Sequence, residues 1–295
     1  MLKDSRVPGQ AAGLLRLARP RPAKGIAVPG GKGGVGKTCV AANLGVALAA
    51  RGLDVMLLDA DLGLANADVV LGLTPRRTLA HVLAGECALA DVIVPGPRGL
   101  RVVPAASGVA GMADLGNSGH AGIIHAFSEL TERLDVLLVD TAAGLSRSVT
   151  PFASAAHRVL VVVCDEPASM TDAYALIKVL SRGHGVRRFE VLASQVRSET
   201  EGRALYEQIR RVCDRFLDVT LDYAGAVPHD ESLRRAVRQQ QPVVDAFPGS
   251  PAAIALKNLA ARADKWEVPG EARGHLEFFV ERLVGNRPAA AGAMQ

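Results

Sequence analysis

The residues most able to do chemistry lie in one glycine-rich stretch, Gly31 to Thr38, which reads GKGGVGKT. It fits the pattern GxxxxGK[ST], in which backbone N–H groups surround a polyphosphate. Residues without a Cβ permit that close approach. Lys37 is expected to reach the β- and γ-phosphates, and the Thr38 hydroxyl to hold Mg²⁺. The residues expected to bind nucleotide here are Gly31, Lys32, Gly33, Gly34, Val35, Gly36, Lys37, Thr38 and Cys39.

The same stretch also fits a second pattern, the dinucleotide fingerprint GxGxxG from Gly31 to Gly36. Asp59 follows at about the distance of the carboxylate that binds ribose in that fingerprint. Two lysines favour the first pattern. Lys32 and Lys37 put two positive charges in one turn, which is more than a pyrophosphate needs and suits a triphosphate. NAD is therefore the less favoured ligand.

Three carboxylates follow short apolar runs and could act beside the glycine-rich loop. Asp59 and Asp61 come after the run 54–58, and Asp140 ends the run 135–139. Such runs predict buried parallel strands, whose carboxyl ends form the edge at which open α/β sheets bind ligands. Asp140 has the pattern of the carboxylate that holds Mg²⁺, usually through water, in phosphate-loop proteins. Helix capping is the open alternative for Asp59 and Asp61.

The rest of the chain must supply the elements that position these residues. Helices are expected at 37–50, 78–85, 119–133, 170–180, 199–216, 231–239 and 250–263. Strands are expected at 25–28, 54–58, 100–103, 135–139, 158–164 and 189–196. This alternation predicts an α/β fold with a mostly parallel twisted sheet covered by helices on both faces. Gly52 is expected to cap the helix that follows the loop.

The composition agrees with one large domain and short extensions. The chain has 295 residues, of which 49% are hydrophobic, and a net charge of +4 that permits an anionic partner without identifying one. The four cysteines lack CxxC or zinc-like spacing, so reduced thiols in the cytoplasm are expected. No signal peptide or membrane-spanning run is evident. We divide the chain into a basic, Pro-rich tail (1–24), a phosphate-loop domain (25–267) and a C-terminal segment (268–295).

Each tail contains one candidate helix. In the first, 10–17 is bracketed by prolines and arginines and could bind a partner. In the second, 275–284 carries apolar residues at i, i+3, i+4 and i+7, which predicts a helix with one apolar stripe. Such a helix could contact a membrane surface, although Glu277 and Glu281 give it little of the basic face that favours this. Packing on the domain or on a dimer partner is the equally open alternative.

Together these motifs resemble the MinD/ParA family of dimerising ATPases. The resemblance covers roughly Gly25 to Ala263 and rests on GKGGVGKT, on DADLGLAN from Asp59 and on VDTAAG from Val139. A lysine at the position of Lys32 marks the deviant phosphate loop of that family. Within the family, the chain is most similar to the FlhG (FleN) branch of MinD-like regulators of flagellar number. That likeness lies in CDEPASMTDAYALIKVL (164–180) and GAVPHD (225–230).

The resemblance implies a slow ATPase that acts as a switch. Two protomers would enclose two ATP molecules, with Lys32 reaching the partner's phosphates and Asp61 positioning the attacking water. These two residues are the expected catalytic pair. Asp59 and Asp140 would support Mg²⁺ together with Thr38. The resemblance places further nucleotide contacts outside the loop, at Ser194, Pro228 and Asp230.

The FlhG branch implies regulation of flagellar number or placement. The implied partners are a second copy of the chain and a flagellar SRP-type GTPase, basal-body components or a flagellar transcriptional activator. The expected location is the cytoplasm, with peripheral contact at the inner membrane face through 275–284. The chain departs from the branch at Gly9 and Leu15 in the GTPase-stimulating motif DQAxxLR. It also has Ser194 and Gln195 where relatives often carry an adenine-binding Asn.

Other branches of the family offer three alternatives. A DNA-segregating ParA-type protein would need a basic surface, for which Arg234, Arg235 and Arg238 are candidates. A MinD-type protein would act at the division site. A metal carrier related to the nitrogenase iron protein would bridge a cluster with cysteines, and the absence of CxxC disfavours it.

Overall fold

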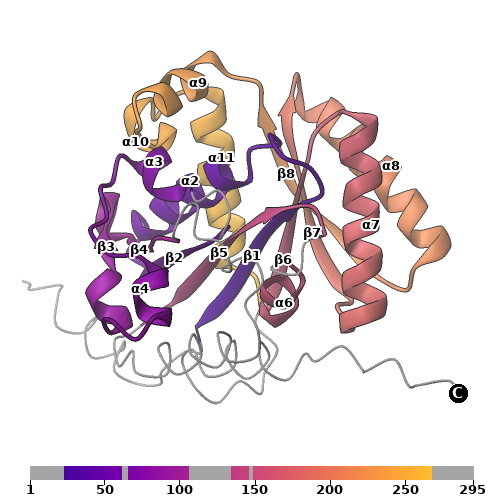
Figure 1. Cartoon of the computed structure of the whole chain (residues 1–295). Coiled ribbons are helices and arrows are strands. Elements are labelled where there is room, and N and C mark those ends of the chain that lie inside the picture. The colour runs from indigo at the N-terminus through magenta and orange to yellow at the C-terminus, as the bar shows by residue number, and fades with distance from the viewer. Residues whose placement is uncertain (1–22, 62–65, 106–133, 146–148, 268–295) are drawn as a thin grey trace, which may run out of the picture.

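The computed structural model describes residues 23–61, 66–105, 134–145 and 149–267, and the statements below concern these residues. Figure 1 shows a central sheet with helices on both faces. The sheet has eight strands in the order β3-β4-β2-β5-β1-β6-β7-β8. Neighbouring strands run parallel, except that β3 is antiparallel to β4. The predicted α/β fold with a mostly parallel sheet is confirmed.

The strands are β1 Lys24–Gly30, β2 Val55–Ala60, β3 Val94–Pro95, β4 Arg101–Val103, β5 Val136–Ala143, β6 Arg158–Val163, β7 Arg188–Val196 and β8 Thr220–Pro228. The α-helices are α2 Lys37–Ala49, α3 Ala67–Leu71, α4 Leu79–Leu83, α6 Val149–Ala155, α7 Pro167–His184, α8 Glu199–Phe216, α9 Glu231–Arg238, α10 Val243–Ala246 and α11 Pro251–Asp264. Two short 3₁₀ turns, η1 Leu89–Val92 and η2 Pro97–Gly99, precede β3 and β4.

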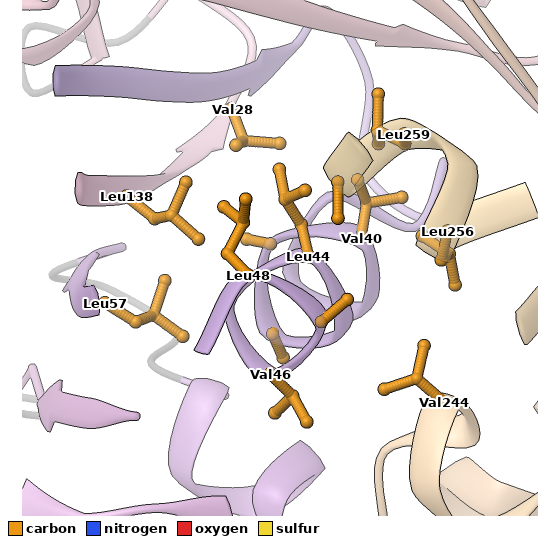
Figure 2. Packing of buried hydrophobic residues seen from close by; sticks show 14 of the residues in the cluster. Val28, Val40, Leu44, Val46, Leu48, Leu57, Leu138, Val244, Leu256 and Leu259 are labelled. Atoms are coloured by element: carbon orange, nitrogen blue, oxygen red, sulfur yellow. The ribbon is translucent and has the colours of Figure 1, made fainter. Parts of the chain in front are cut away.

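Different helices cover the two faces of the sheet, because successive residues of a strand point to opposite sides. On one face α2 packs over the central strands and α11 packs beside it against β8, together with α3, α9 and α10. Figure 2 shows this core, with α2 facing the sheet and α11 beside it; its labelled residues are Val28, Val40, Leu44, Val46, Leu48, Leu57, Leu138, Val244, Leu256 and Leu259. On the other face α4, α6, α7 and α8 complete two further clusters. The sheet is therefore buried on both sides, as a parallel sheet requires.

Most predicted elements are present, with ends that differ by a few residues. Helix α8 has the predicted bounds, whereas α7 begins three residues earlier, at a proline suited to the first helical position. The prediction for Gly52 was wrong: α2 ends at Ala49 with Ala50 as its C-cap, and Gly52 lies beyond with φ of 85°. The predicted helices at 10–17, 119–133 and 275–284 lie outside the described residues. Within the described ranges, no helix is long and apolar enough to cross a membrane.

Candidate nucleotide-binding site

The glycine-rich loop joins β1 to α2 at the carboxyl edge of the sheet, as the sequence predicted. Gly36 is the N-cap of α2 and has φ of 93°, a left-handed conformation that glycine adopts without strain. Helix α2 has no side-chain cap and no acidic residue in its first turn. Its first N–H groups are therefore available to an anion, which the helix dipole also attracts.

The glycines of the loop do not all serve the same purpose. A Cβ on Gly31 would lie 2.4 Å from the backbone carbonyl carbon of Asp172 in α7. A Cβ on Gly33 or Gly34 would have no heavy atom within 4 Å. The contact with α7 requires a glycine at position 31, while the open space lies at Gly33 and Gly34.

Lys37 and Asp140 form the buried electrostatic centre of the site. The Lys37 side chain is largely buried, and its Nζ lies 3.4 Å from the carbonyl oxygen of Lys32. Burial lowers the pKa of Lys37, although the charges of Asp140 and Asp61 act in the opposite direction. The unfavourable burial of this ammonium group would be offset by an anion in the loop.

The Asp140 carboxylate is 1% exposed, and neither of its oxygens has a hydrogen-bond partner among the described residues. Burial and then the charge of Asp59 raise the pKa of Asp140 to about 8. The side-chain hydroxyl of Thr38 and the positive charge of Lys37 act to lower it. Buried polar atoms are rarely left without a partner. A carboxylate in this state fits the predicted role of accepting hydrogen bonds from water bound to Mg²⁺.

Asp59 has a different environment, although it is the register partner of Asp140 on the neighbouring strand. Its oxygens accept hydrogen bonds from the N–H groups of Asp61 at 3.0 Å and of Asn66 and Ala67 at 3.1 Å. Burial raises the pKa of Asp59 to about 6 despite these hydrogen bonds. The carboxylate thus fixes the chain after β2 and the start of α3, which is the capping role considered above. A carboxylate engaged in this way is not available to bind a ribose.

Asp61, the predicted catalytic carboxylate, directly follows β2 and lies near enough to Lys37 and Asp140 to affect the pKa of each. The structure therefore brings Asp61 to the loop, and its catalytic role stays a prediction.

Lys32, the other predicted catalytic residue, forms an ion pair within its own chain. Its Nζ donates a hydrogen bond to the carboxylate of Glu166, the residue before α7. The hydrogen bond and the negative charge of Glu166 raise the pKa of Lys32. Both side chains are about half exposed, at 42% and 55%. This pairing was not predictable from the sequence, because the two residues are 134 positions apart.

A cavity of about 540 Å³ adjoins the loop and is large enough for a nucleoside. It lies between the loop, the ends of β7 and β8, and helix α9. Six predicted nucleotide contacts line it, namely Gly34, Gly36, Cys39, Ser194, Pro228 and Asp230. The structure adds residues that the sequence had not indicated as contacts, among them Gln195, Leu233 and Arg234.

Two of the predicted contacts have structural roles as well. The Asp230 carboxylate accepts hydrogen bonds from Ser232 N–H at 2.8 Å and Ala252 N–H at 3.0 Å, so it caps α9 and ties it to α11. Burial acts to raise the pKa of Asp230, but these hydrogen bonds outweigh it and the pKa is lowered. Burial raises the pKa of the Cys39 thiol to about 12. Cys39 therefore contributes a neutral, weakly polar wall to the cavity.

The features needed by two alternative functions are weak in the described part of the chain. Of the three arginines proposed as a DNA-binding surface, Arg235 lies over the ring of Phe247 and Arg238 pairs with Glu231 at 2.7 Å. Arg234 and Arg238 both line the cavity instead of forming a separate basic surface. The four cysteines are free, and no described group of three or more His, Cys, Asp or Glu side chains is arranged to hold a metal ion.

Comparison with known proteins agrees with this geometry. Residues 26–243 match the family described as the CobQ/CobB/MinD/ParA nucleotide binding domain. The chain is 58% identical over 281 residues to the antiactivator FleN of Pseudomonas aeruginosa, covering 95% of this chain and 100% of the relative. It is 32% identical over 270 residues to the flagellum site-determining protein YlxH of Helicobacter pylori, covering 88% and 90% of the two chains.

One similar solved structure contains a bound nucleotide. The septum site-determining protein MinD of Pyrococcus horikoshii, complexed with Mg-ADP, superposes with a TM-score of 0.68 at 28% identity. The match covers 82% of this chain and 96% of that one. Most of the chain therefore shares its fold with a protein that binds Mg-ADP. The chain belongs to the CobQ/CobB/MinD/ParA family of nucleotide-binding proteins.

Proposed function

We propose that this protein is an ATPase switch that dimerises on ATP and regulates the number or placement of flagella. The observation that carries the proposal is the pairing of a two-lysine phosphate loop with a buried, unpartnered Asp140. The end-to-end similarity to FleN and the similarity to YlxH support the flagellar role, since their names refer to antiactivation and to flagellar site determination.

The residues of the site have distinct tasks in this proposal. The loop N–H groups and Lys37 bind the phosphates, and the cavity beside β8 receives the nucleoside. Thr38 and Asp140 would hold Mg²⁺, Asp140 through water, and the ion would neutralise phosphate charge. Asp59 supports this arrangement by fixing the chain that follows β2. Asp61 orients the water that attacks the γ-phosphorus.

Lys32 connects hydrolysis to dimerisation. A cation supplied across the interface stabilises charge on the γ-phosphoryl group only when two protomers have joined. In the single chain, the ammonium group is held by Glu166. We therefore propose that dimer formation transfers Lys32 from Glu166 to the nucleotide of the partner protomer.

The ATP-bound dimer is the form that a partner would read. The word antiactivator in the name of FleN favours a flagellar transcriptional activator as that partner. A flagellar SRP-type GTPase and basal-body components are the further candidates. The proposed location is the cytoplasm, with peripheral contact at the inner membrane face through 275–284.

Light scattering on the full chain tests the switch. With Mg-ATP, an Asp61→Ala variant that cannot hydrolyse ATP should have twice the monomer mass of 30.8 kDa, and with Mg-ADP it should remain monomeric. Adding Lys32→Ala to this variant should leave ATP binding in place and reduce the dimer fraction. A monomer under all conditions would refute the dimerising switch.

A gene deletion in the host tests the biological role. Flagella per cell should change in number or position, and a plasmid copy of the wild type should restore them, whereas Lys32→Ala should not. Normal flagella together with division defects would favour the MinD-type alternative. Normal flagella with chromosome loss, and salt-sensitive DNA binding in vitro, would favour the ParA-type alternative.

A further inference from the structure

Gln195 has an unusual backbone conformation at the mouth of the nucleotide cavity. It lies near the end of β7 and has φ of 59°, in the left-handed region that residues other than glycine seldom occupy. The β7–β8 register shifts between Ser194 and Val196, so Gln195 is one extra residue on its strand. Bulges of this kind turn a side chain away from the regular sheet direction and often lie next to functional sites.

The bulge directs the Gln195 side chain onto the phosphate loop. Its Nε2 donates a hydrogen bond of 2.7 Å to the carbonyl oxygen of Gly34. A strained residue that crosses to a ligand-binding loop suggests a function, because the strain lowers stability without improving the core. Gln195 is exposed and contributes no buried apolar surface.

The hydrogen bond acts on the part of the loop that packing leaves open. Gly31 is held against α7, the Val35 side chain is buried, and Gly36 faces the hydroxyl of Ser194. Gly33 and Gly34, by contrast, have open space at their Cβ positions. The peptide units on either side of Gly33 and Gly34 can therefore rotate at little energetic cost, because glycine tolerates a wide range of backbone angles.

Because the peptide bond is planar, this hydrogen bond also determines the orientation of the Val35 N–H group, which can bind phosphate. The carbonyl of Gly34 and the N–H of Val35 belong to the same peptide unit, and in a trans peptide they point in opposite directions. When Gln195 holds the Gly34 oxygen, the Val35 N–H faces the other side of the unit, away from Gln195. The orientation of one loop donor is thereby set before a ligand arrives.

We propose that Gln195 is a positioning residue that pre-orders the phosphate loop for the polyphosphate part of the nucleotide. Gln195 acts through its hydrogen bond to Gly34 and does not bind the base of the nucleotide. This inference rests on the proposed nucleotide binding and extends it to a residue outside the loop. It separates the role of Gln195 from that of Ser194, whose buried hydroxyl lies against Gly36.

The test compares Gln195→Met, which keeps the side-chain length but cannot donate, with the wild-type full chain. Gln208→Met, at an exposed position of α8, is the matched control. The dissociation constants of Mg-ATP and of inorganic triphosphate with Mg²⁺ are measured by calorimetry. In Gln195→Met both should rise by the same factor, roughly fivefold for one hydrogen bond. Hydrogen exchange at 33–36 should accelerate, and kcat at saturating ATP should stay near the wild-type value.

A second variant, Gln195→Gly, separates positioning from folding. Because glycine relieves the left-handed strain, its Tm should rise while its affinity for both ligands falls. Unchanged affinity for triphosphate in both variants would overturn the inference. A loss confined to ATP would also overturn it, because that result identifies a contact with the nucleoside. If the wild type bound neither ligand, the proposed function would fail and this inference with it.

Discussion

Buried charged side chains at the two ends of the sheet differ in whether they have partners within the protein. At the carboxyl ends of the strands, Lys37 is buried on the loop and Asp140 has no hydrogen-bond partner among the described residues. At the amino ends, the buried charges are paired. Lys24 Nζ donates to the carbonyl oxygens of Ala263 at 2.7 Å and Asp264 at 2.9 Å. At the carboxyl end Asp140 still has room for a partner that a ligand could supply, whereas Lys24 at the amino end already has partners within the protein.

The amino end continues this pattern across the sheet. On β6, Arg158 pairs with Glu190 of β7 at 3.2 Å and donates two hydrogen bonds to the carbonyl of Glu267. These contacts join the end of α11 to the first residue of β1, and the chain just beyond α11 to the first residue of β6. Removing one partner of a buried ion pair strongly destabilises a protein, whereas buried charges without a partner often mark sites of function. The same strands therefore serve stability at one end and ligand binding at the other.

The largest effect should come from breaking the pair at the amino end. Arg158→Met leaves Glu190 buried without its cation, which we expect to cost about 4 kcal/mol of unfolding free energy at pH 8. The loss should be smaller at pH 5, where Glu190 can bind a proton. Urea unfolding followed by circular dichroism measures both values. An unchanged free energy at pH 8 would show that this end is not the stabilising one.

A pair of lysine substitutions compares the two ends directly. Lys37→Met should weaken Mg-ATP binding on the order of 100-fold, because it removes charge-assisted contacts to phosphate, and should leave the Tm of the apo protein unchanged or higher. Lys24→Met should lower the unfolding free energy by about 2 kcal/mol and leave ATP affinity unchanged. Calorimetric titration and thermal unfolding of both variants provide the test. Loss of affinity in Lys24→Met would contradict the separation.

The amino end should also determine part of the pH dependence of stability. Burial and then the charge of Asp222 raise the pKa of Glu190 from 4.5 to about 7, although Arg158 and Arg188 act against the rise. The folded state then binds the proton more tightly than the unfolded state. The contribution of Glu190 to stability is therefore greatest below about pH 4.5 and is lost as the pH rises through 7.

Glu190→Gln measures this contribution. Between pH 5 and pH 8, the Tm of the wild type should fall by about 5 °C more than that of the variant. Parallel Tm curves for the two proteins would assign the pH dependence to other groups.

The smallest effect is expected at the exposed pair on the ligand side. Glu166→Gln should leave the Tm unchanged, because exposed ion pairs contribute little to stability. It should raise the ATP-dependent dimer fraction a few-fold, since Lys32 no longer has to leave a charged partner. Asp165→Asn, which changes a neighbouring exposed carboxylate, is the control. Light scattering across a concentration series measures the shift, and a weaker dimer would mean that Glu166 supports the interface.

Local patterns were enough to predict the centre of the fold. The apolar runs that end at Asp59 and Asp140 became adjacent strands, and the glycine-rich loop opens a helix, as expected. Strand β8 was missed because Thr220, Asp222 and Gly225 interrupt its apolar pattern. The short helices α3 and α6 were also missed. Their few residues carry too little periodicity to be recognised.

The part of the site that consists of short local motifs could be predicted from the sequence. The loop, Asp61 and Asp140 could be proposed from the sequence because residue types at short spacing indicate them, and the structure places them near one another. The contacts of Lys32 with Glu166 and of Gly34 with Gln195 join residues more than 130 positions apart. The left-handed conformation of Gln195 depends on its place in the sheet. Such features arise only when the strands have assembled.

The contact of Gly31 with α7 has a practical consequence. Because no side chain separates the two backbones, a displacement of the first turn of the loop must be passed directly to the helix. Val179, on the same helix, is 36% exposed and far along it from that contact. A fluorophore attached at that position would therefore act as a remote reporter of nucleotide occupancy, readable in real time without labelling the ligand.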